Sequence, residues 1–329
     1  MKTRKILPIA MALPVALMFA CSTETLMPPV DETAEGAPES SDAILPGSSD
    51  ALVQSSSDAL VQSSSDALVA SSSAVVPTSS ASGSGNYVFY GAELSGTDQF
   101  KYGRFEARMK MVSIPGSVSS MFLYYDDSWK KEDEPWNEID IEVLGKGGTM
   151  WQSNIITREA DPSIKANTSS ESKPLHEFGF DATQDFHLFA IVWTPEYVAW
   201  EIDSMEIRRD TLGMERGTHA DKDQVAFLTE NQSLRFNLWA SKSVGWVGKF
   251  TGEELAAGPQ EQVIDYVRVY AYDAATKGFT QLWQDDFEGT ALSDHWNVGN
   301  WEMEKVELSP FNVVVEGGFC KLRLSREEE

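Results

Sequence analysis

The feature that most constrains the fold is a strict alternation of acidic and apolar residues from Glu138 to Val143. Acidic residues occupy positions 138, 140 and 142, and aliphatic residues occupy 139, 141 and 143. Successive side chains of a β-strand point to opposite faces, so a strand would place the three carboxyl groups together on one face. The aliphatic side chains would then pack into a core. The segment is therefore predicted to be a strand with one acidic and one buried face.

Alternation with a period of two recurs along residues 87–326, and no long helical pattern is present. Gly, Pro, Asn and Asp separate the alternating stretches at short intervals, as turns require. This pattern predicts an all-β fold, a jelly-roll sandwich of two antiparallel sheets. A β-propeller is disfavoured because no blade-length repeat is present. The clearest further strands are expected at 104–111, Phe186–Trp193, Tyr197–Ile202, Leu234–Trp239, Val263–Tyr272 and Phe319–Leu324.

The first 20 residues have the organisation of an export signal, with three basic residues ahead of the apolar run Ile6–Phe19. That run is shorter than the roughly 20 apolar residues that span a bilayer. Ala20 and Cys21 follow it, which resembles a bacterial lipoprotein processing site and implies a lipid on Cys21. The expected location is the bacterial cell envelope, at the outer membrane or cell surface. The alternative is an ordinary secretory signal cleaved after Ala20, which would release a secreted protein.

Residues 21–85 are rich in serine and contain an eight-residue repeat at Ser49–Gln54, Ser57–Gln62 and Ser65–Val69. No aromatic residue, Lys or Arg occurs in this stretch, so it has too little apolar surface to offset the entropy of ordering. A β-solenoid is the competing interpretation of such a period, but one Leu-Val pair per copy makes a poor core. We expect a disordered tether of roughly 45 Å reach, followed by a folded domain at 86–329.

The charge of the chain limits its partners. Lys and Arg number 26 against 51 Asp and Glu, a formal net charge of −25. Phosphate backbones and acidic polysaccharides would be repelled, so nucleic acid is not an expected partner. A membrane contact is expected only through the lipid anchor. A neutral polysaccharide is compatible with this charge, and we expect a monomer.

The spacing of Glu138 and Glu142 suggests a reaction. On a strand their Cα atoms lie about 13 Å apart, and side chains leaning toward each other could bring the carboxyl groups to about 5 Å. Retaining glycosidases hold their two carboxyl groups roughly 5–5.5 Å apart, and inverting ones about 6.5–9.5 Å. A solvated strand face is the alternative, but such faces usually mix charge signs, and Trp136 and Trp151 flank this one.

The motif Glu138–Glu142 followed by Val143-Leu144-Gly145 resembles the signature of glycoside hydrolase family 16, and within it the lichenases of the Fibrobacter type. The segment that resembles the first strands of most lichenases, Trp283–Leu324, comes last here, as in the circularly permuted members. A fold with adjacent surface termini tolerates such a rearrangement. Further resemblance lies at Tyr102–Met111, Ser119–Tyr124, Gln152–Thr157, Leu234–Trp239 and Trp246–Gly248.

The resemblance implies a role for each carboxylate. Glu138 resembles the nucleophile, Asp140 the assisting carboxylate and Glu142 the general acid/base. Enzymes specific for β-1,3-glucan typically carry an extra residue between the last two acids, and this chain has none. The expected activity is thus endo-hydrolysis of mixed-linkage β-1,3-1,4-glucan with retention. A laminarinase, a xyloglucanase and a non-catalytic glucan-binding jelly roll remain alternatives.

Aromatic and amide side chains are expected to line the sugar site, because aromatic rings can cover the apolar faces of pyranoses. Phe122 and Tyr124 share a strand face by alternation. The resemblance assigns to the cleft the aromatic residues Phe122, Tyr124, Trp136, Trp239, Trp246 and Trp301, and Gln152, Asn154, Arg235 and Asn237 as partners of hydroxyl groups.

No cofactor is expected for catalysis, but the resemblance implies a structural calcium ion at Asp265, Asp286 and Gly318. Carboxylate oxygens suit a hard cation. Cys320 alternates with Leu322 and Leu324 and is predicted to be a small buried apolar residue. The charged stretch 126–134 is expected to be a loop beside the cleft, which either tunes chain-length preference or is a solvated turn.

Overall fold

The computed structural model describes residues 86–130, 134–159, 170–171, 173–216 and 223–329. The expected signal peptide, the Ser-rich tether and Cys21 lie outside these residues. Within the described ranges, no helix combines the length and the apolar character needed to cross a membrane.

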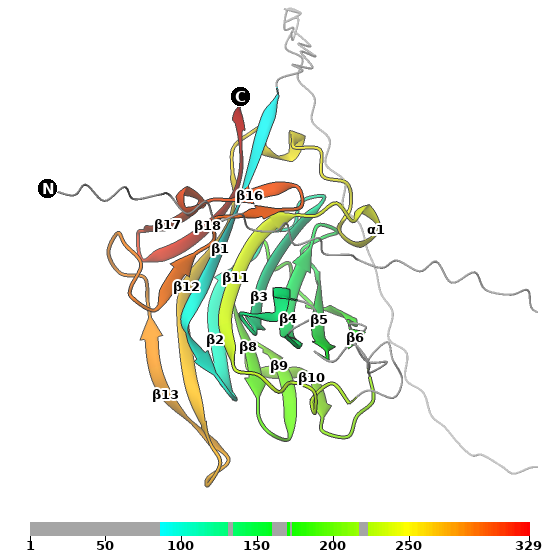
Figure 1. The fold of residues 1–329 in the computed structure, drawn as a ribbon. Coiled ribbons are helices and arrows are strands. Elements are labelled where there is room, and N and C mark those ends of the chain that lie inside the picture. Colours follow the sequence, from blue (N-terminus) through cyan, green and yellow to red (C-terminus); the bar gives the residue numbers. More distant parts are fainter. Residues whose placement is uncertain (1–85, 131–133, 160–169, 172, 217–222) are drawn as a thin grey trace, which may run out of the picture. The chain divides into compact units, whose positions relative to one another are not determined.

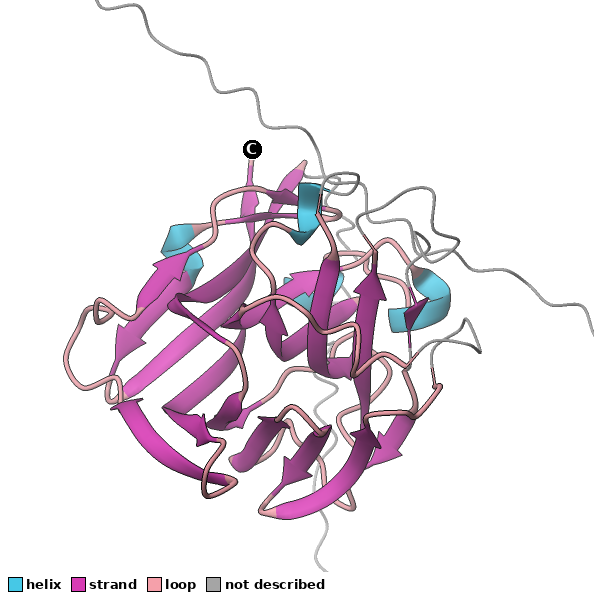
Figure 2. Ribbon diagram, turned by 60° about the horizontal axis from the view of Figure 1, so that its bottom comes forward, coloured by secondary structure: helices cyan, strands magenta, loops and turns pink. Residues whose placement is uncertain are grey.

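The described chain is built almost entirely of strands, with short helical turns between some of them (Figure 1, Figure 2). The first half contains β1 Tyr87–Phe100, β2 Gly103–Lys110, β3 Ser117–Tyr124, η1 Ser128–Lys130, β4 Trp136–Leu144, β5 Met150–Arg158, β6 Ser170–Glu171, β7 Leu175–Glu177, β8 His187–Trp193, β9 Tyr197–Ile202 and β10 Met205–Thr211. The second half contains β11 Gln232–Ala240, α1 Val244–Val247, η2 Glu253–Leu255, β12 Gln260–Asp273, β13 Gly278–Asp285, β14 Trp296–Val298, β15 Glu302–Met303, β16 Val306–Leu308, η3 Pro310–Asn312, β17 Val313–Glu316 and β18 Phe319–Glu328.

One layer of strands carries the predicted carboxylate strand. Its antiparallel order is β14, β1, β11, β3, β4 and β5, with β6 and β7 both paired to β5. The second layer runs β13, β12, β2, β8, β9 and β10, also antiparallel. Strand β18 pairs with β12, β17 and β1, which links the two layers. The predicted all-β sandwich is confirmed, and each strand singled out in the sequence is present and starts within three residues of the expected position.

The core lies between these layers. Ile139 and Ile141 of β4 and Phe105 and Ala107 of β2 are fully buried in one apolar cluster. Cys320 belongs to the same cluster, which confirms it as a buried apolar residue. Burial raises the pKa of its thiol well above the ordinary value, so the thiol stays protonated.

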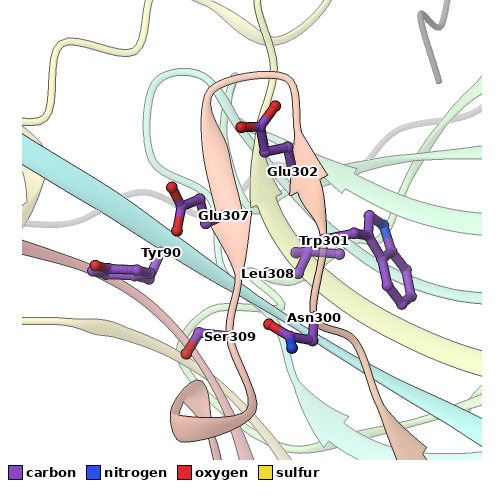
Figure 3. A pocket seen from close by; sticks show the side chains of 7 residues that line it. All are labelled: Tyr90, Asn300, Trp301, Glu302, Glu307, Leu308 and Ser309. Carbon is purple, nitrogen blue, oxygen red and sulfur yellow. The ribbon is translucent and has the colours of Figure 1, made fainter. Parts of the chain in front are cut away.

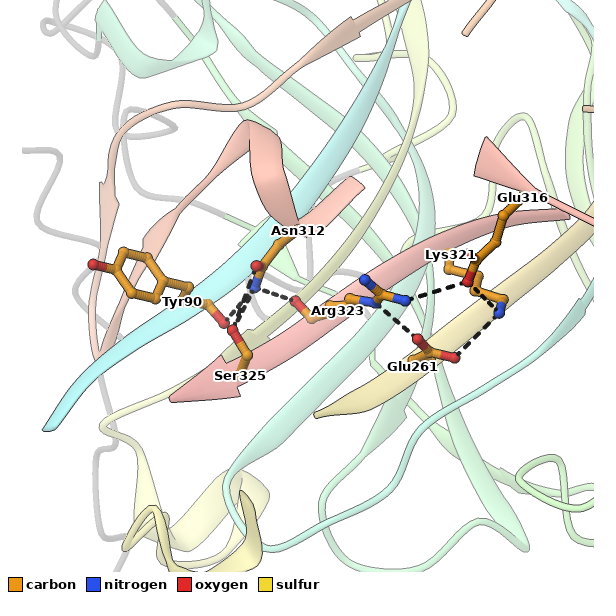
Figure 4. A network of polar contacts seen from close by, with 7 residues as sticks. All are labelled: Tyr90, Glu261, Asn312, Glu316, Lys321, Arg323 and Ser325. Atoms are coloured by element: carbon orange, nitrogen blue, oxygen red, sulfur yellow. Dashed lines mark hydrogen bonds and ion pairs between the residues drawn. The ribbon is translucent and has the colours of Figure 1, made fainter. Parts of the chain in front are cut away.

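The two ends of the described domain are neighbours in one sheet. Tyr87 of β1 is paired with Glu328 of β18, and the Glu329 amide donates to the Asn86 carbonyl over 3.0 Å. Side chains reinforce this region, because the Asn312 amide donates to the Tyr90 and Arg323 carbonyls at 3.0 Å each (Figure 4). The Arg323 guanidinium in turn donates to Glu261 over 2.8 Å, which fastens β18 to β12.

Candidate active site

The predicted strand is β4, and its two faces differ as expected. Ile139, Ile141 and Val143 are fully buried in the core. Glu138 and Glu142 on the other face are partly exposed, whereas Asp140 between them is buried at 3% exposure. We call the side of the sheet that carries these three acids the carboxylate face. Two carboxylates that a ligand can reach therefore flank one that it reaches less easily.

The strand register brings predicted residues from four strands onto the carboxylate face, beside residues of β1, because directly paired residues point to the same side. Three lateral rows result. From β1 to β5, the first row is Glu93, Asn237, Ser120, Glu142 and Gln152, and the second is Ser95, Arg235, Phe122, Asp140 and Asn154. The third row, from β11, is Ser233, Tyr124, Glu138 and Ile156.

Glu138 lies among aromatic side chains. The indole N–H of Trp136 donates to Glu138 Oε2 over 2.6 Å. Tyr124 is directly opposite Glu138 on β3. Burial raises the pKa of the Tyr124 phenol, and the nearby charge of Glu138 raises it further. The phenol is thus neutral and close enough to sense the Glu138 carboxylate.

Glu142 is held by an amide. Gln152 Nε2 donates to Glu142 Oε2 over 2.7 Å. The indole N–H of Trp246 donates to the other end of that amide, Gln152 Oε1, over 3.3 Å. Trp246 also packs against Trp239, with ring centroids 6.1 Å apart. A chain of neutral groups therefore orients the Glu142 carboxylate.

Asp140 is fixed through its backbone from the opposite layer. The indole N–H of Trp200 on β9 donates to the Asp140 carbonyl over 2.9 Å. Both Trp200 and Asp140 are buried. The middle of β4 is therefore anchored by a hydrogen bond across the sandwich.

Three aromatic residues predicted to bind sugar form a chain of edge-to-face contacts. Ring centroids are 6.4 Å apart for Phe122 and Tyr124, and 5.8 Å apart for Tyr124 and Trp136. The guanidinium groups of Arg235 and Arg158 lie 4.9 and 5.3 Å from the Tyr124 and Trp136 centroids, respectively. Such packing fixes ring orientation, which suits a surface that stacks on pyranose rings.

Arg235 was expected to bind hydroxyl groups, and the structure places it in a network of acids. Its guanidinium donates to Glu93 and to Asp126 over 2.8 Å each, and its Nε donates to Ser233 over 3.0 Å. Asn237 accepts a hydrogen bond from Ser120 Oγ over 2.6 Å. Both residues lie on the carboxylate face, and Arg235 also neutralises acidic charge there.

Glu93 is a carboxylate of this face that the sequence analysis missed. It is 3% exposed, and burial raises its pKa, although Arg235 opposes the shift. A lone acid between Ala92 and Leu94 in an alternating stretch was the available signal. Its place beside Asn237 depends on the pairing of β1 with β11, which sequence alternation does not give.

Trp301 lies beyond the Glu93 end of the first row. A Cβ atom added at Gly299 would stand 3.0 Å from Glu93 Cβ and 3.2 Å from the Trp301 ring, so glycine permits this close approach. Trp301 is 42% exposed. It also borders a cavity of about 310 Å³ at the β15–β16 hairpin, lined by Tyr90, Asn300, Trp301, Glu302, Glu307, Leu308 and Ser309 (Figure 3).

Two of the three residues expected to hold calcium are engaged in other contacts. Asp265 Oδ2 accepts from Arg108 over 2.6 Å, and Asp286 accepts from Gln284 Nε2 over 2.6 Å. Gly318 has a φ of +78°, and a Cβ there would be 3.7 Å from Glu288 Oε1. Within the described residues, no group of three or more His, Cys, Asp or Glu side chains could hold a metal ion. Calcium at this place stays a prediction that depends on backbone oxygens.

The charged stretch 126–134 is described except for residues 131–133. Asp126 accepts hydrogen bonds from Gln99 over 2.7 Å and Ser233 over 2.6 Å. At the far end, Glu134 accepts from the Tyr125 hydroxyl over 2.9 Å. The start of this stretch is thus fastened to β1 and β11, next to the carboxylate face.

Comparison with known proteins places the chain in one family. The family model described as glycosyl hydrolases family 16 matches residues 50–266, and the chain belongs to this family. The chain is 40% identical over 245 residues to a beta-glucanase of Fibrobacter succinogenes, a match that covers 73% of this chain and 64% of that protein.

Other relatives carry the same name. A beta-glucanase of Acetivibrio thermocellus is 32% identical over 187 residues, which cover 56% of this chain and 47% of that protein. Among solved structures, a Bacillus licheniformis beta-glucanase aligns with a TM-score of 0.38 and 27% identity over 49% of this chain and 64% of that one. The chain spans less than two thirds of the length of these relatives.

Proposed function

We propose that this protein is a retaining endo-β-glucanase that hydrolyses mixed-linkage β-1,3-1,4-glucan. The observation that carries the proposal is the placement of Glu138 and Glu142, both partly exposed on one face of β4 with buried Asp140 between them. Side chains four residues apart on a strand can close around one glycosidic bond.

The proposed reaction is a double displacement. Glu138 attacks the anomeric carbon while Glu142 protonates the departing glycosidic oxygen, which leaves a glycosyl ester on Glu138. Glu142 then takes a proton from water as the water attacks the same carbon, which releases Glu138 and restores the starting protonation states. Asp140, between the two glutamates, adds negative charge that favours the protonated acid/base. Two inversions give net retention.

The proposed substrate follows from the neutral and aromatic character of the site. Tyr124 and Trp136 offer ring surfaces beside Glu138, with Phe122 packed edge-to-face on Tyr124, and the chain's net charge of −25 favours a neutral polymer. Relatives named beta-glucanase support a glucan. The absence of an inserted residue between Asp140 and Glu142 favours the mixed linkage over a pure β-1,3 linkage.

The test is hydrolysis of lichenan, barley glucan, laminarin and xyloglucan by the wild type and by Glu138→Gln and Glu142→Gln. The wild type should release reducing ends fastest from the first two polymers, and both variants should lose this activity. Glu206→Gln, an exposed carboxylate on β10, is the matched control and should retain it. Undiminished hydrolysis by either active-site variant would refute the proposed catalytic pair. Binding of glucan without hydrolysis by the wild type would favour the binding-module alternative.

The two glutamates have distinguishable roles. With an aryl glucoside that has a good leaving group, Glu142→Ala should still form the glycosyl enzyme, whereas Glu138→Ala should not. Azide should accelerate Glu142→Ala and yield a β-azide. Proton NMR of the first product of the wild type should show the β-anomer. An initial α-anomer would contradict the retaining mechanism.

We further propose that Cys21 carries the lipid anchor, that the enzyme is an exported monomer, and that calcium stabilises the domain at Asp265, Asp286 and Gly318. The mass of the mature N-terminus tests the first proposal, and sedimentation tests the monomer. For calcium, chelation should lower the melting temperature and added calcium should restore it. An unchanged melting temperature would show that calcium does not stabilise the domain.

A further inference from the structure

A polar cluster lies on the reverse side of β5, opposite the carboxylate face. Ser153 sits between Gln152 and Asn154 on this strand, points the other way and is fully buried. Its hydroxyl is 2.7 Å from His176 Nε2 on β7. Arg208 Nη1 on β10 donates to the same hydroxyl oxygen over 2.9 Å. One hydroxyl therefore joins an imidazole to a buried guanidinium.

The guanidinium connects this cluster to the catalytic strand. Arg208 is 5% exposed and donates through Nε to Asp210 over 3.0 Å. It also stacks on Trp200, 4.3 Å from the ring centroid. Trp200 donates to the Asp140 carbonyl. A continuous series of contacts thus runs from His176 to the middle of β4.

The donors in this series favour one protonation state of the imidazole. A guanidinium can only donate, so the Ser153 oxygen accepts from Arg208. Donation of the hydroxyl proton to His176 Nε2 gives that proton an acceptor, and this arrangement needs a neutral imidazole with its proton on Nδ1. Protonation would make Nε2 a donor. The hydroxyl would then face two cationic donors, and its own proton would lose this acceptor.

We propose that His176 is a positioning residue whose neutral imidazole holds β5 and β4 in register for hydrolysis, and whose protonation in acid loosens this support. The inference rests on the proposed glucanase function. Loss of the Ser153 contact would displace Gln152, the neighbouring residue on β5, and so change the position of the Glu142 carboxylate that Gln152 binds. The same loss would shift Arg208, which packs on Trp200, and Trp200 binds the Asp140 carbonyl.

The surroundings of His176 favour the neutral form. Burial is the first cause of a pKa below the ordinary value of 6.5, and the charge of Arg208 lowers it further. Asp210, on the same strand as Arg208, acts in the opposite direction. The exposed Glu177 is its neighbour on β7. Since the folded state binds this proton less readily than the unfolded state, the stabilising contribution is present above pH 6.5 and is lost as pH falls through the folded pKa.

The test compares pH profiles of kcat for the wild type, His176→Gln and His295→Gln. Glutamine accepts a hydrogen bond from Ser153 but does not titrate. His176→Gln should match the wild type at pH 7 and retain about threefold more of its kcat on the acid limb, within the 10²-fold range that a 1 Å misplacement can cause. His295 pairs with Asp98 in another part of the domain, so its variant should follow the wild-type profile.

An acid limb that is unchanged in His176→Gln, or that shifts equally in His295→Gln, would overturn the inference. The double variant Ser153→Ala/His176→Gln should have the acid limb of Ser153→Ala alone, because the imidazole acts through this hydroxyl. Two separate shifts would contradict that route.

Nitrogen NMR of the His176 imidazole separates this inference from the proposed function. Nε2 should be unprotonated at neutral pH, and Ser153→Ala should raise the pKa by removing a donor to the neutral form. A protonated Nε2 at neutral pH would overturn the inference even in an active enzyme. If His176 titrates as expected but the enzyme hydrolyses none of the glucans, the proposed function is refuted and the inference about His176 protonation is not.

Discussion

Two acids in one row of the carboxylate face, Glu93 and Glu142, differ in their exposure and in their hydrogen-bond donors. At the β1 end, Glu93 is 3% exposed and accepts a hydrogen bond from the Arg235 guanidinium over 2.8 Å. Toward the β5 end, Glu142 is partly exposed and accepts from the neutral Gln152 amide over 2.7 Å. Asn237 and Ser120 separate the two acids.

This difference separates structural from reactive carboxylates. A buried carboxylate that accepts from a guanidinium holds neighbouring strands together, and removing one partner leaves an uncompensated charge. A carboxylate held by a neutral donor and open to the surface is oriented but can still exchange a proton with a ligand. The four predictions below test this distinction, beginning with the largest expected effect.

The largest contrast is expected between Glu138→Gln and Glu93→Gln, the same substitution at an open and at a buried carboxylate. The first should lower kcat on lichenan by about 10⁴-fold or more, because it removes the proposed nucleophile. The second should lower kcat by about 10²-fold or less, through altered packing. Steady-state kinetics on one substrate measures both. Equal losses of kcat in the two variants would contradict the distinction between structural and reactive carboxylates.

A smaller loss is expected from the donor to Glu142. Gln152→Ala removes the amide that orients the carboxylate and should lower kcat by about tenfold, the equivalent of one hydrogen bond to a charged group. Asn137→Ala does not serve as a control because that side chain anchors the 227–230 segment. Thr280 is exposed on β13, and Thr280→Ala is therefore the control. An unaltered kcat in Gln152→Ala would show that Glu142 is positioned by other contacts.

Trp301 tests how far the substrate surface extends past Glu93. Trp301→Ala should raise KM about fivefold with little change in kcat, because the lost ring contact stabilises ground and transition states alike. Phe311 is 90% exposed on η3 and does not line the cavity at the β15–β16 hairpin. Phe311→Ala is therefore the control. A fall in kcat rather than a rise in KM would move Trp301 into the reacting part of the site.

The smallest effect concerns stability and pH. Burial raises the folded pKa of Glu93 above its ordinary value of 4.5, so the protonated form is favoured on folding. The stabilising contribution is fully present below pH 4.5 and is lost as pH rises through the folded pKa. The unfolding free energy of the wild type relative to Glu93→Gln should therefore increase as pH falls. The opposite slope, measured by urea unfolding, would mean that the Arg235 pairing outweighs burial.

The sequence predicted what depends on local alternation. The strand at Trp136–Leu144, its buried Ile139 and Ile141, and the common face of its acids all follow from the two-residue period of a pleated strand. The family resemblance assigned Gln152 and Arg235 to the cleft, whereas the register of the strands puts Gln152 beside Glu142 and Arg235 beside Phe122. Alternation gives each strand two faces without telling which strands are neighbours.

Side chains whose roles depend on long-range strand pairing were not predicted from the sequence. Arg208 and Asp210 lie in a charged stretch that reads as exposed, yet both are buried against β5 and Trp200. His176 and Ser153 meet only because β7 pairs with β5. Their contacts join segments that no local pattern connects, so three-dimensional placement was needed to find them.

The neighbouring ends of the described domain have a mechanical consequence. Strand β1 pairs with two different strands along its length, with β18 near Tyr87 and with β11 near Glu93. A pulling force that enters at Tyr87 while a polymer grips the carboxylate face would load both ladders along β1 in shear, so many hydrogen bonds would resist together. Resistance to such a force depends on the unfolding rate rather than on equilibrium stability. The strand that receives the load is also the strand that supplies Glu93 to the substrate side.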